Sequence, residues 1–206
     1  MTEHSPAAQV WEERYGADHY VYGTEPNGFL RDHVDTLPPG GEVLCLADGE
    51  GRNSVFLAST GRRVSSVDLS AAGVSKTLRL AADRGVVVDA RVADLAHYDL
   101  GHERWDGIVS IFAHVPAPVR TDLHRRVVDA LRPGGILLLE AYTPEQVGRG
   151  TGGPPSVDLT MTAGSLREEL RPLELVLCVE VEREVVEGVG HTGAGSVVQV
   201  VARKPG

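Results

Sequence analysis

Residues 45–61 read CLADGEGRNSVFLASTG, and the organisation of the chain can be worked out from them. The apolar run EVLCLA at 42–47 comes directly before two glycines that flank a glutamate. A helical pattern follows at 52–60, with Gly61 as its stop. A strand that ends in a glycine-containing turn before a helix is the point at which doubly wound α/β proteins bind ligands. We therefore expect an α/β fold with a ligand site at this turn.

The same strand and helix pattern repeats along the chain. Ser70 is expected to cap a helix that ends at Gly85, and another helix is expected to begin near Pro116. Further apolar strands are expected at 63–70, 86–92, 105–112 and 136–141. Continuous apolar strands that alternate with helices indicate a parallel sheet covered on both faces.

The end of the chain has a different pattern. Residues 173–188 alternate apolar and acidic side chains, and a second strand is expected at 195–204 after a glycine-rich turn. Two such strands form an antiparallel hairpin. The predicted fold is a doubly wound, mostly parallel, seven-stranded sheet with a C-terminal hairpin. We expect an N-terminal cap segment at 1–36 and one domain at 37–206.

Composition limits the partners. The net charge of −9 disfavours a nucleic acid, because such partners need clustered basic residues. No apolar run is long enough for a membrane span, and the eight histidines show no metal-ligand spacing. Cys45 and Cys178 are the two cysteines, with no secretory start, which indicates a reduced cytoplasmic compartment. A monomer or homodimer with a small-molecule partner and no metal is expected.

The glycine turn is not typical of two common phosphate sites. Ser54 stands where a dinucleotide fingerprint has its third glycine, and the turn has no lysine for a P-loop. Asp68 ends the next strand, where a carboxylate can accept hydrogen bonds from the ribose hydroxyls of an adenosine. Asp94 follows the third strand and can accept from an adenine amino group, with Leu95 packed on the ring. The residues therefore indicate an adenosine-containing cofactor without choosing one.

The sequence resembles the class I S-adenosylmethionine-dependent methyltransferases over roughly residues 40–204. The resemblance depends on VLCLADGEG, Asp68, Asp94, WDGIVSIFAH and LRPGGILLLEAYTPEQ. It implies a Rossmann-like methyltransferase fold and S-adenosylmethionine as cofactor. Within the class, GEGRN, FAHVP and residues 11–30 look like the tellurite-resistance and thiol methyltransferase-like branch, in which an N-terminal segment covers the cofactor.

The resemblance also implies a set of cofactor-binding residues. These are Ala47, Asp48, Gly49, Glu50, Gly51, Asn53, Asp68, Leu69, Asp94, Leu95, Ile111 and Phe112. Two positions differ from the usual motif. The family often has an acid in place of Cys45 and a glycine in place of Ala47. Asp48 or Glu50 is expected to substitute for the missing acid.

Candidate substrate residues lie nearby in the sequence. His114, just after the fourth strand, can orient a substrate or act as a base, and Tyr142 and Gln146 follow the fifth strand. His114 and Tyr142 are the candidate catalytic residues. His191 is expected to be an exposed turn histidine. Half of the ten aromatic residues are concentrated near the N-terminus, where they form either a lid or core packing: Trp11, Tyr15, Tyr20, Tyr22 and Phe29.

Three functions fit this pattern. The first is methyl transfer from S-adenosylmethionine to a thiol, a chalcogen oxyanion such as tellurite, or another small metabolite. Such a transfer requires an aligned nucleophile and exclusion of water, and it needs no metal. The second is binding of an adenosine cofactor without catalysis. The third is an NAD(P)-dependent oxidoreductase, which the missing third glycine and the terminal hairpin disfavour.

Overall fold

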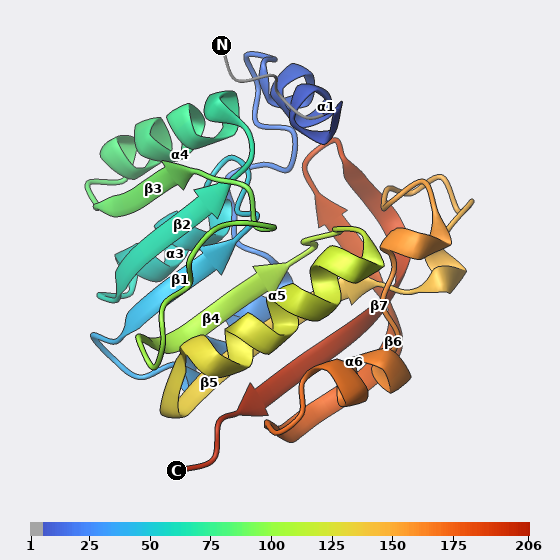
Figure 1. Cartoon of the computed structure of the whole chain (residues 1–206). Helices are drawn as coiled ribbons and strands as arrows, with labels where there is room; N and C mark the ends of the chain where they lie inside the picture. Colours follow the sequence, from blue (N-terminus) through green and yellow to red (C-terminus); the bar gives the residue numbers. More distant parts are fainter. Residues whose placement is uncertain (1–5) are drawn as a thin grey trace.

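The computed structural model describes residues 6–206. Within them, seven strands form one sheet in the order β3-β2-β1-β4-β5-β7-β6 (Figure 1). The strands are β1 (Glu42–Leu46), β2 (Arg63–Asp68), β3 (Val88–Val92), β4 (Trp105–Ile111), β5 (Leu131–Tyr142), β6 (Glu174–Glu187) and β7 (His191–Arg203). The first five are parallel, and β7 runs antiparallel to both β5 and β6. The predicted fold class is confirmed.

Helices cover both faces of this sheet. The α-helices are α1 (Pro6–Tyr15), α2 (Gly28–His33), α3 (Arg52–Ser59), α4 (Ala71–Asp83), α5 (Ala117–Ala130) and α6 (Ala163–Glu169). Short 3₁₀ helices span Val34–Thr36, Pro144–Gln146 and Val157–Leu159. No helix within residues 6–206 is long and apolar enough to cross a membrane.

The alternation of side chains along the strands divides the core into two layers. Leu44 and Leu46 of β1 pack with α5 and α6, which lie in front of the sheet in Figure 1. Val43 and Cys45 point the other way and pack with α2, α3 and α4. The site at the carboxyl ends of the strands is therefore built on a rigid two-sided core.

Several element boundaries differ from the sequence expectation. Strand β3 begins at Val88 instead of residue 86, because Val86 N still donates to Ala81 O at the end of α4. Strand β5 begins at Leu131, which pairs with Trp105 before a shift in register. Ser70 caps α4 as predicted, since its Oγ accepts from Gly73 N at 3.0 Å.

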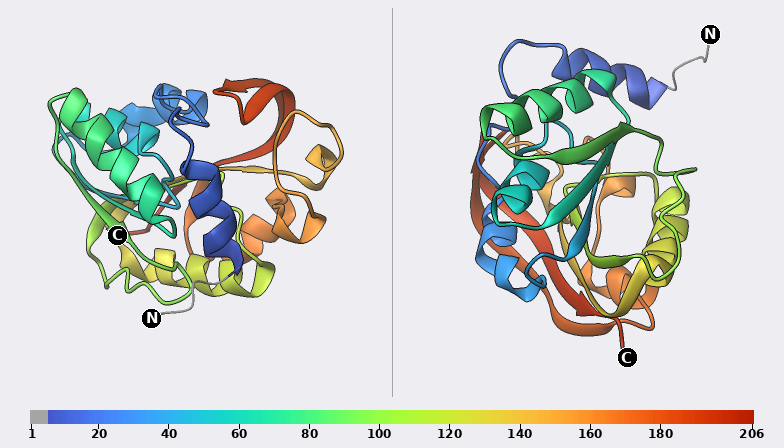
Figure 2. Two further views of the ribbon diagram at one scale, coloured as in Figure 1. Left: turned by 90° about the horizontal axis from the view of Figure 1, so that it is seen from above. Right: turned by 90° about the vertical axis from the view of Figure 1, so that its left-hand side faces the viewer.

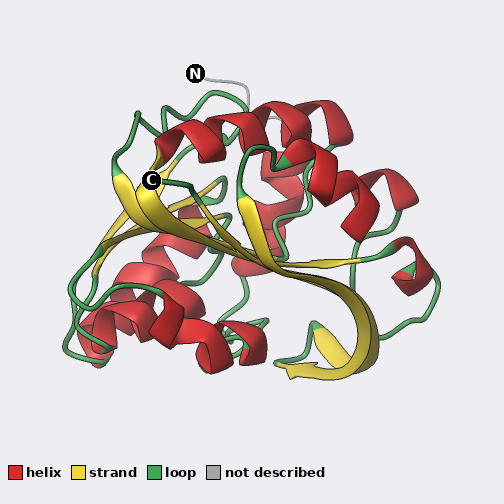
Figure 3. Ribbon diagram, turned by 90° about the horizontal axis from the view of Figure 1, so that it is seen from below, coloured by secondary structure: helices red, strands yellow, loops and turns green. Residues whose placement is uncertain are grey.

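The terminal hairpin has a shorter turn than expected. Strand β7 begins at His191 instead of residue 195, because Gly193 and Gly195 pair with β6 in the ladder. The prediction of His191 as an exposed turn histidine is wrong, since its side chain is 6% exposed. The two long strands curve strongly away from the plane of the sheet (Figure 3).

The tip of the hairpin meets the N-terminal segment. The backbone amides of Val189 and Gly190 donate to Val21 O at 2.8 and 3.1 Å. Gly190 must be a glycine, because a Cβ there would collide with the ring of Tyr22. Seen from above, α1 crosses the top of the molecule beside α4 and the hairpin (Figure 2, left). Residues distant in sequence are thus brought over the carboxyl ends of the central strands.

Candidate active site

The turn after β1 has an unusual backbone. Ala47, Gly49 and Gly51 have φ values of 48°, 62° and 90°, all in the left-handed region. A Cβ on Gly49 would lie 2.7 Å from the Tyr15 hydroxyl, and one on Gly51 would lie 2.6 Å from Thr77. The glycines are therefore required both by conformation and by close packing. Ala47 adopts a conformation that disfavours a side chain.

Replacing Ala47 with glycine is expected to stabilise the fold by about 0.5–1 kcal/mol. The left-handed conformation costs a non-glycine residue about 1–2 kcal/mol, and the greater freedom of glycine in the unfolded chain offsets part of the gain. Urea denaturation would measure this change. The matched control is Ala82→Gly on the exposed face of α4, which should destabilise by about 0.5–1 kcal/mol. Equal losses in both variants would contradict the strain at Ala47.

Two aspartates meet beside this turn. Asp68 Oδ2 accepts from Gly49 N at 2.8 Å, and Oδ1 accepts from Ser70 N at 2.9 Å. Asp48 Oδ2 accepts from Ser54 Oγ, whereas Oδ1 is buried without a hydrogen-bond partner within the described residues. Burial raises the pKa of Asp68, and it raises the pKa of Asp48 to about 7. Asp48 thus offers an unused acceptor that titrates near neutrality.

The pKa of Asp48 makes stability depend on pH. Its pKa in the folded protein, about 7, lies above the ordinary 3.8, so between these values the folded state binds more protons than the unfolded chain. This contribution to stability is present below pH 4 and is lost as the pH rises toward 7.

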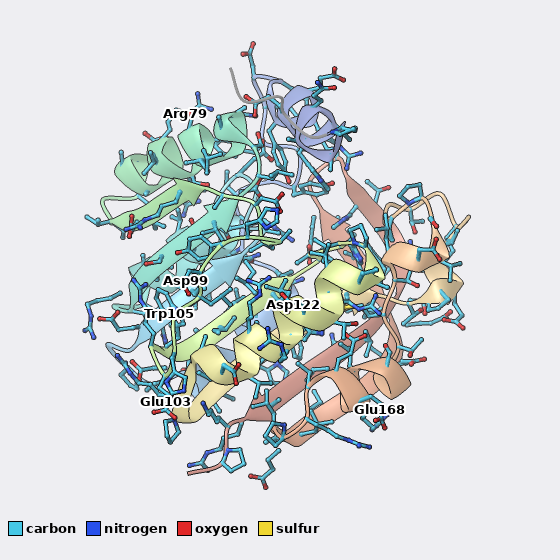
Figure 4. The ribbon with its side chains drawn as sticks, viewed as in Figure 1. Arg79, Asp99, Glu103, Trp105, Asp122 and Glu168 are labelled. Carbon is cyan, nitrogen blue, oxygen red and sulfur yellow. The ribbon has the colours of Figure 1, made fainter. Side chains whose placement is uncertain are left out.

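The shift from 3.8 to about 7 is worth about 4 kcal/mol, so Asp48→Asn is expected to raise the free energy of unfolding by up to about 4 kcal/mol at pH 8 and by almost nothing at pH 4. Urea titrations across this pH range would measure the difference. Asp99→Asn serves as the control, because Asp99 is exposed near the amino ends of the strands (Figure 4). Parallel pH curves for wild type and Asp48→Asn would show that the buried carboxyl is not responsible.

Glu50 and Asn53 of the same turn are engaged with the N-terminal segment. Glu50 accepts from Val21 N at 2.7 Å and pairs with Lys76 Nζ at 2.7 Å. Asn53 Oδ1 accepts from Asn27 N at 3.0 Å. Asp48 and Glu50 are the two acids expected to substitute for the family acid that Cys45 replaces. Of these two, only Asp48 has a carboxylate oxygen without a partner among the described residues.

The remaining predicted cofactor residues lie at the same edge of the sheet. Asp94 is exposed after β3, and its Oδ1 accepts from Ala96 N at 2.9 Å. Leu95 is 7% exposed and packs in the core, Leu69 is half-buried between Asp68 and Ser70, and Ile111 ends β4. Their contacts with a cofactor stay predictions.

Four rings gather at the carboxyl ends of β4 and β5 and the start of β7. Phe112 lies 4.6 Å from Tyr142 and 4.7 Å from His191 between ring centroids, and His114 lies 5.7 Å from Tyr142. We call Phe112, His114, Tyr142 and His191 the ring cluster. Phe112 has φ 55°, and left-handed strain of this kind in a non-glycine residue gathers at functional sites.

The ring cluster contains unpaired polar atoms. His114 Nδ1 lies 2.8 Å from Leu159 O, and because a carbonyl only accepts, Nδ1 carries the proton. His114 Nε2 is therefore a bare acceptor, buried without a partner among the described residues, as is the Tyr142 hydroxyl. Burial lowers the pKa of His114 to about 4 and raises the pKa of Tyr142. Both side chains are neutral at physiological pH.

Three of the five predicted lid residues continue this cluster toward the N-terminus. Ring centroids lie 5.4 Å apart for Trp11 and Tyr15, 6.4 Å for Tyr15 and Tyr22, and 4.7 Å for Tyr22 and His191. A continuous row of rings thus runs from α1 to β4.

Three other predicted residues lie apart from this row. Tyr20 packs against α4, where its hydroxyl donates to Lys76 O at 3.3 Å. Phe29 of α2 is 4% exposed and packs in the core. The Gln146 side chain donates to Gly152 O at 2.8 Å and accepts from Ser196 N at 2.9 Å. In this structure it therefore fastens a loop to β7.

A buried charged network lies beside the ring cluster, and the sequence analysis missed it. Glu140 accepts from Asn27 Nδ2 at 2.6 Å and from Arg183 Nε at 2.8 Å. Glu187 pairs with Arg52 at 2.5 Å and with Arg183 at 3.2 Å. The available signal was Glu140 itself, an acid inside the apolar run ILLLEA. The network joins α2, α3, β5 and β6.

Part of the sequence matches a described family. Residues 43–135 match the family described as methyltransferase domain. Three uncharacterized proteins, one from Mycobacterium bovis and two from strains of Mycobacterium tuberculosis, are each 28% identical over 109 residues. The match spans 53% of this chain and 40% of each relative.

Solved structures show the same fold. NodS, an N-methyltransferase from Bradyrhizobium japonicum in complex with S-adenosylhomocysteine, has a TM-score of 0.70 at 15% identity, covering 98% of this chain and 100% of that one. TehB from Haemophilus influenzae has a TM-score of 0.71 at 19% identity, covering 96% and 66%. A third structure concerns the conversion of a disulfide bond into a thioacetal group during echinomycin biosynthesis. It has a TM-score of 0.78 at 20% sequence identity, covering 97% of this chain and 92% of that one.

The similar solved structures share the fold in which the strands of this chain are arranged. The chain therefore has the Rossmann-like fold of the methyltransferases, and its residues 43–135 match the methyltransferase domain family.

Proposed function

We propose that this protein transfers a methyl group from S-adenosylmethionine to a small-molecule nucleophile. The observation that carries the proposal is the turn Ala47–Gly51. The Gly49 amide of this turn donates to Asp68, and Asp48 Oδ1 is buried without a hydrogen-bond partner among the described residues. The family match over residues 43–135 and the S-adenosylhomocysteine complex of the similar NodS structure support this cofactor.

The residues at the turn fit this cofactor chemically. When bound, the cofactor supplies an electrophilic methyl group on a sulfonium. Asp68 would hold the ribose hydroxyls, and Gly49 and Gly51 allow close approach of the ligand to the backbone. The buried Asp48 oxygen would face a positively charged ligand, whose attraction favours the ionised carboxylate. Asp94 would accept from the adenine amino group.

The acceptor would lie at the ring cluster, with His114 and Tyr142 contacting it. A thiol, a chalcogen oxyanion such as tellurite, or another small metabolite are the proposed acceptors. The echinomycin structure, whose description concerns sulfur chemistry, supports a sulfur nucleophile. The similarity to TehB keeps the tellurite-resistance branch as a candidate. Such an enzyme would act in the cytoplasm, where the buried thiols of Cys45 and Cys178 stay reduced.

The N-terminal segment would act as a cap. Glu12 Oε2 accepts from Ser70 Oγ at 2.6 Å, and the Tyr15 ring lies against Gly49 and Gly73. Residues 1–5 of the proposed cap at 1–36 lie outside the described residues. Asn27 and Leu30 are fully buried, so a truncation designed to remove the cap and spare the fold must end before Asn27.

Incubating the purified protein with methyl-labelled S-adenosylmethionine and either benzyl mercaptan or tellurite tests this proposal. We expect S-adenosylhomocysteine to form only when an acceptor is present. Binding of the cofactor without turnover of a broad acceptor panel would instead indicate an adenosine-binding protein without catalysis. The [4+2]-cyclase SpnF, with a TM-score of 0.69 at 17% identity, shows that this fold can carry another reaction.

A further inference from the structure

Two buried polar atoms of opposite character at the glycine turn have no hydrogen-bond partner within residues 6–206. One is the carboxylate oxygen Asp48 Oδ1, and the other is the guanidinium nitrogen Nη1 of Arg52. Arg52 is the first residue of α3 and is 7% exposed. A buried charged group without a partner costs more free energy than a neutral one, so native structures pair such groups. The two atoms therefore point to a ligand that supplies both partners.

The Arg52 guanidinium is positioned by the terminal hairpin. Its Nη2 donates to Glu187 of β6 at 2.5 Å, and both side chains of this pair are 8% exposed. Glu187 also pairs with Arg183 at 3.2 Å, so the carboxylate is held from a second side. Glu187 thus fixes one nitrogen of the Arg52 guanidinium, and Nη1 stays available to another anion.

Arg52 lies between the glycine turn and the ring cluster. Burial has the largest influence on the pKa of Asp48 and of His191, and the charge of Arg52 acts on both. Helix α3 begins at Arg52 directly after Gly51, and no described side chain caps it. The N-terminus of a helix favours a negative ligand, which adds to the attraction of the guanidinium. A carboxylate is therefore favoured beside Arg52, and a cationic donor is favoured beside Asp48.

This pair of atoms matches a zwitterion better than a simple ion. An α-amino acid carries an ammonium donor and a carboxylate acceptor on the same carbon atom. A bare carboxylate would leave Asp48 Oδ1 unpaired, and a bare amine would leave Arg52 Nη1 unpaired. S-adenosylmethionine has an α-amino acid at one end and an adenosine at the other, and Asp68 and Asp94 are proposed to hold the adenosine.

We propose that Asp48 and Arg52 hold the zwitterionic amino acid end of the cofactor, with Asp48 Oδ1 accepting from its ammonium group and Arg52 Nη1 donating to its carboxylate. This inference rests on the proposed function and assigns a residue that the sequence analysis left out. Glu187 is a positioning residue, because it acts through Arg52. Cofactor binding is thereby coupled to the hairpin, since Glu187 is 135 positions from Arg52 in the chain.

The first test uses the wild-type protein and three ligands in isothermal calorimetry. The ligands are S-adenosylhomocysteine, its decarboxylated analogue, and methylthioadenosine, which lacks the whole amino acid. Loss of the carboxylate is expected to raise Kd about 10- to 100-fold, because Arg52 Nη1 is then left without its partner. Equal affinities for all three ligands would overturn the inference and leave the proposed function standing. If none of the three binds, the proposed function itself fails, so the two failures are distinguishable.

The second test removes the guanidinium. Arg52→Met is expected to raise Kd for S-adenosylhomocysteine about 10- to 100-fold and to change Kd for methylthioadenosine less than twofold, because the latter has no carboxylate. The matched control is Arg125→Met at an exposed position of α5, which should leave both affinities unchanged. Equal losses for the two ligands in Arg52→Met would show that Arg52 only supports the turn, which contradicts the proposal.

Further variants keep the test decisive if Arg52→Met fails to fold. Combining it with Glu187→Met removes both partners of the buried pair, so that neither is left without the other, and the same selective loss is expected. Asp48→Asn should raise Kd for S-adenosylhomocysteine about tenfold, and Glu187→Gln about threefold to tenfold, with little change for methylthioadenosine. An affinity for S-adenosylhomocysteine within twofold of wild type in Asp48→Asn or Glu187→Gln would contradict the role of that residue.

Discussion

Replacing Glu140 with alanine is expected to lower the free energy of unfolding by about 3–5 kcal/mol, the usual cost of removing one partner from a buried ion pair. Glu140 is fully buried and accepts from Asn27 at 2.6 Å, Arg183 at 2.8 Å and Gln199 at 2.7 Å. Without Glu140, the largely buried Arg183 guanidinium keeps its ion pair with Glu187 but loses its ion pair with Glu140. Urea denaturation followed by circular dichroism would measure the change.

The matched control is Glu168→Ala on α6 (Figure 4). Glu168 pairs with Arg171, but both side chains are largely exposed, so the change should stay below about 0.5 kcal/mol. A loss below 1 kcal/mol for Glu140→Ala would mean that water reaches the network and that it does not fix α2 against the sheet.

Asp68→Ala is expected to weaken binding of S-adenosylhomocysteine by about 1–3 kcal/mol, which is roughly 5- to 150-fold in Kd. The carboxylate would lose its contact with the ribose, and the amides of Gly49 and Ser70 would lose the acceptor that positions the turn. Isothermal calorimetry measures this loss. Asp122→Ala, an exposed position on α5 in Figure 4, is the control and should leave the affinity unchanged. An affinity for Asp68→Ala within twofold of wild type would refute the ribose assignment.

The sheet and the glycine turn could be predicted because their signals are local. Apolar runs, turn glycines and helix caps each lie within about ten residues, and Ser70 caps α4 as its sequence context indicates. The strained position of Ala47 could also be anticipated, since a glycine is usual there and the structure gives φ 48°.

The polar partners of the site could not be predicted, because they come from distant segments. Glu50 belongs to the glycine turn, yet its carboxylate accepts a hydrogen bond from Val21 N and forms an ion pair with Lys76. The Glu140 network joins residues as far apart as Asn27 and Glu187, separated by 160 positions. No local sequence pattern indicates such pairings, because they depend on how the N-terminal segment and the hairpin pack together.

The position of His191 was also predicted wrongly from its local sequence. Its glycine-rich surroundings are typical of an exposed turn, but Gly193 and Gly195 lie in the β6–β7 ladder. The histidine is consequently buried against Tyr22, Phe112 and Tyr142. Glycine in a strand here marks a close approach of other side chains, since a Cβ on Gly195 would lie 2.9 Å from Val185 and 3.1 Å from Tyr142.

Isothermal calorimetry of the purified protein with S-adenosylhomocysteine and, separately, with NAD shows directly which cofactor the glycine turn binds. We expect micromolar binding of S-adenosylhomocysteine and no binding of NAD, because the turn lacks the third glycine of a dinucleotide site. Binding of NAD alone, or of neither ligand, would contradict the assignment of the turn to S-adenosylmethionine.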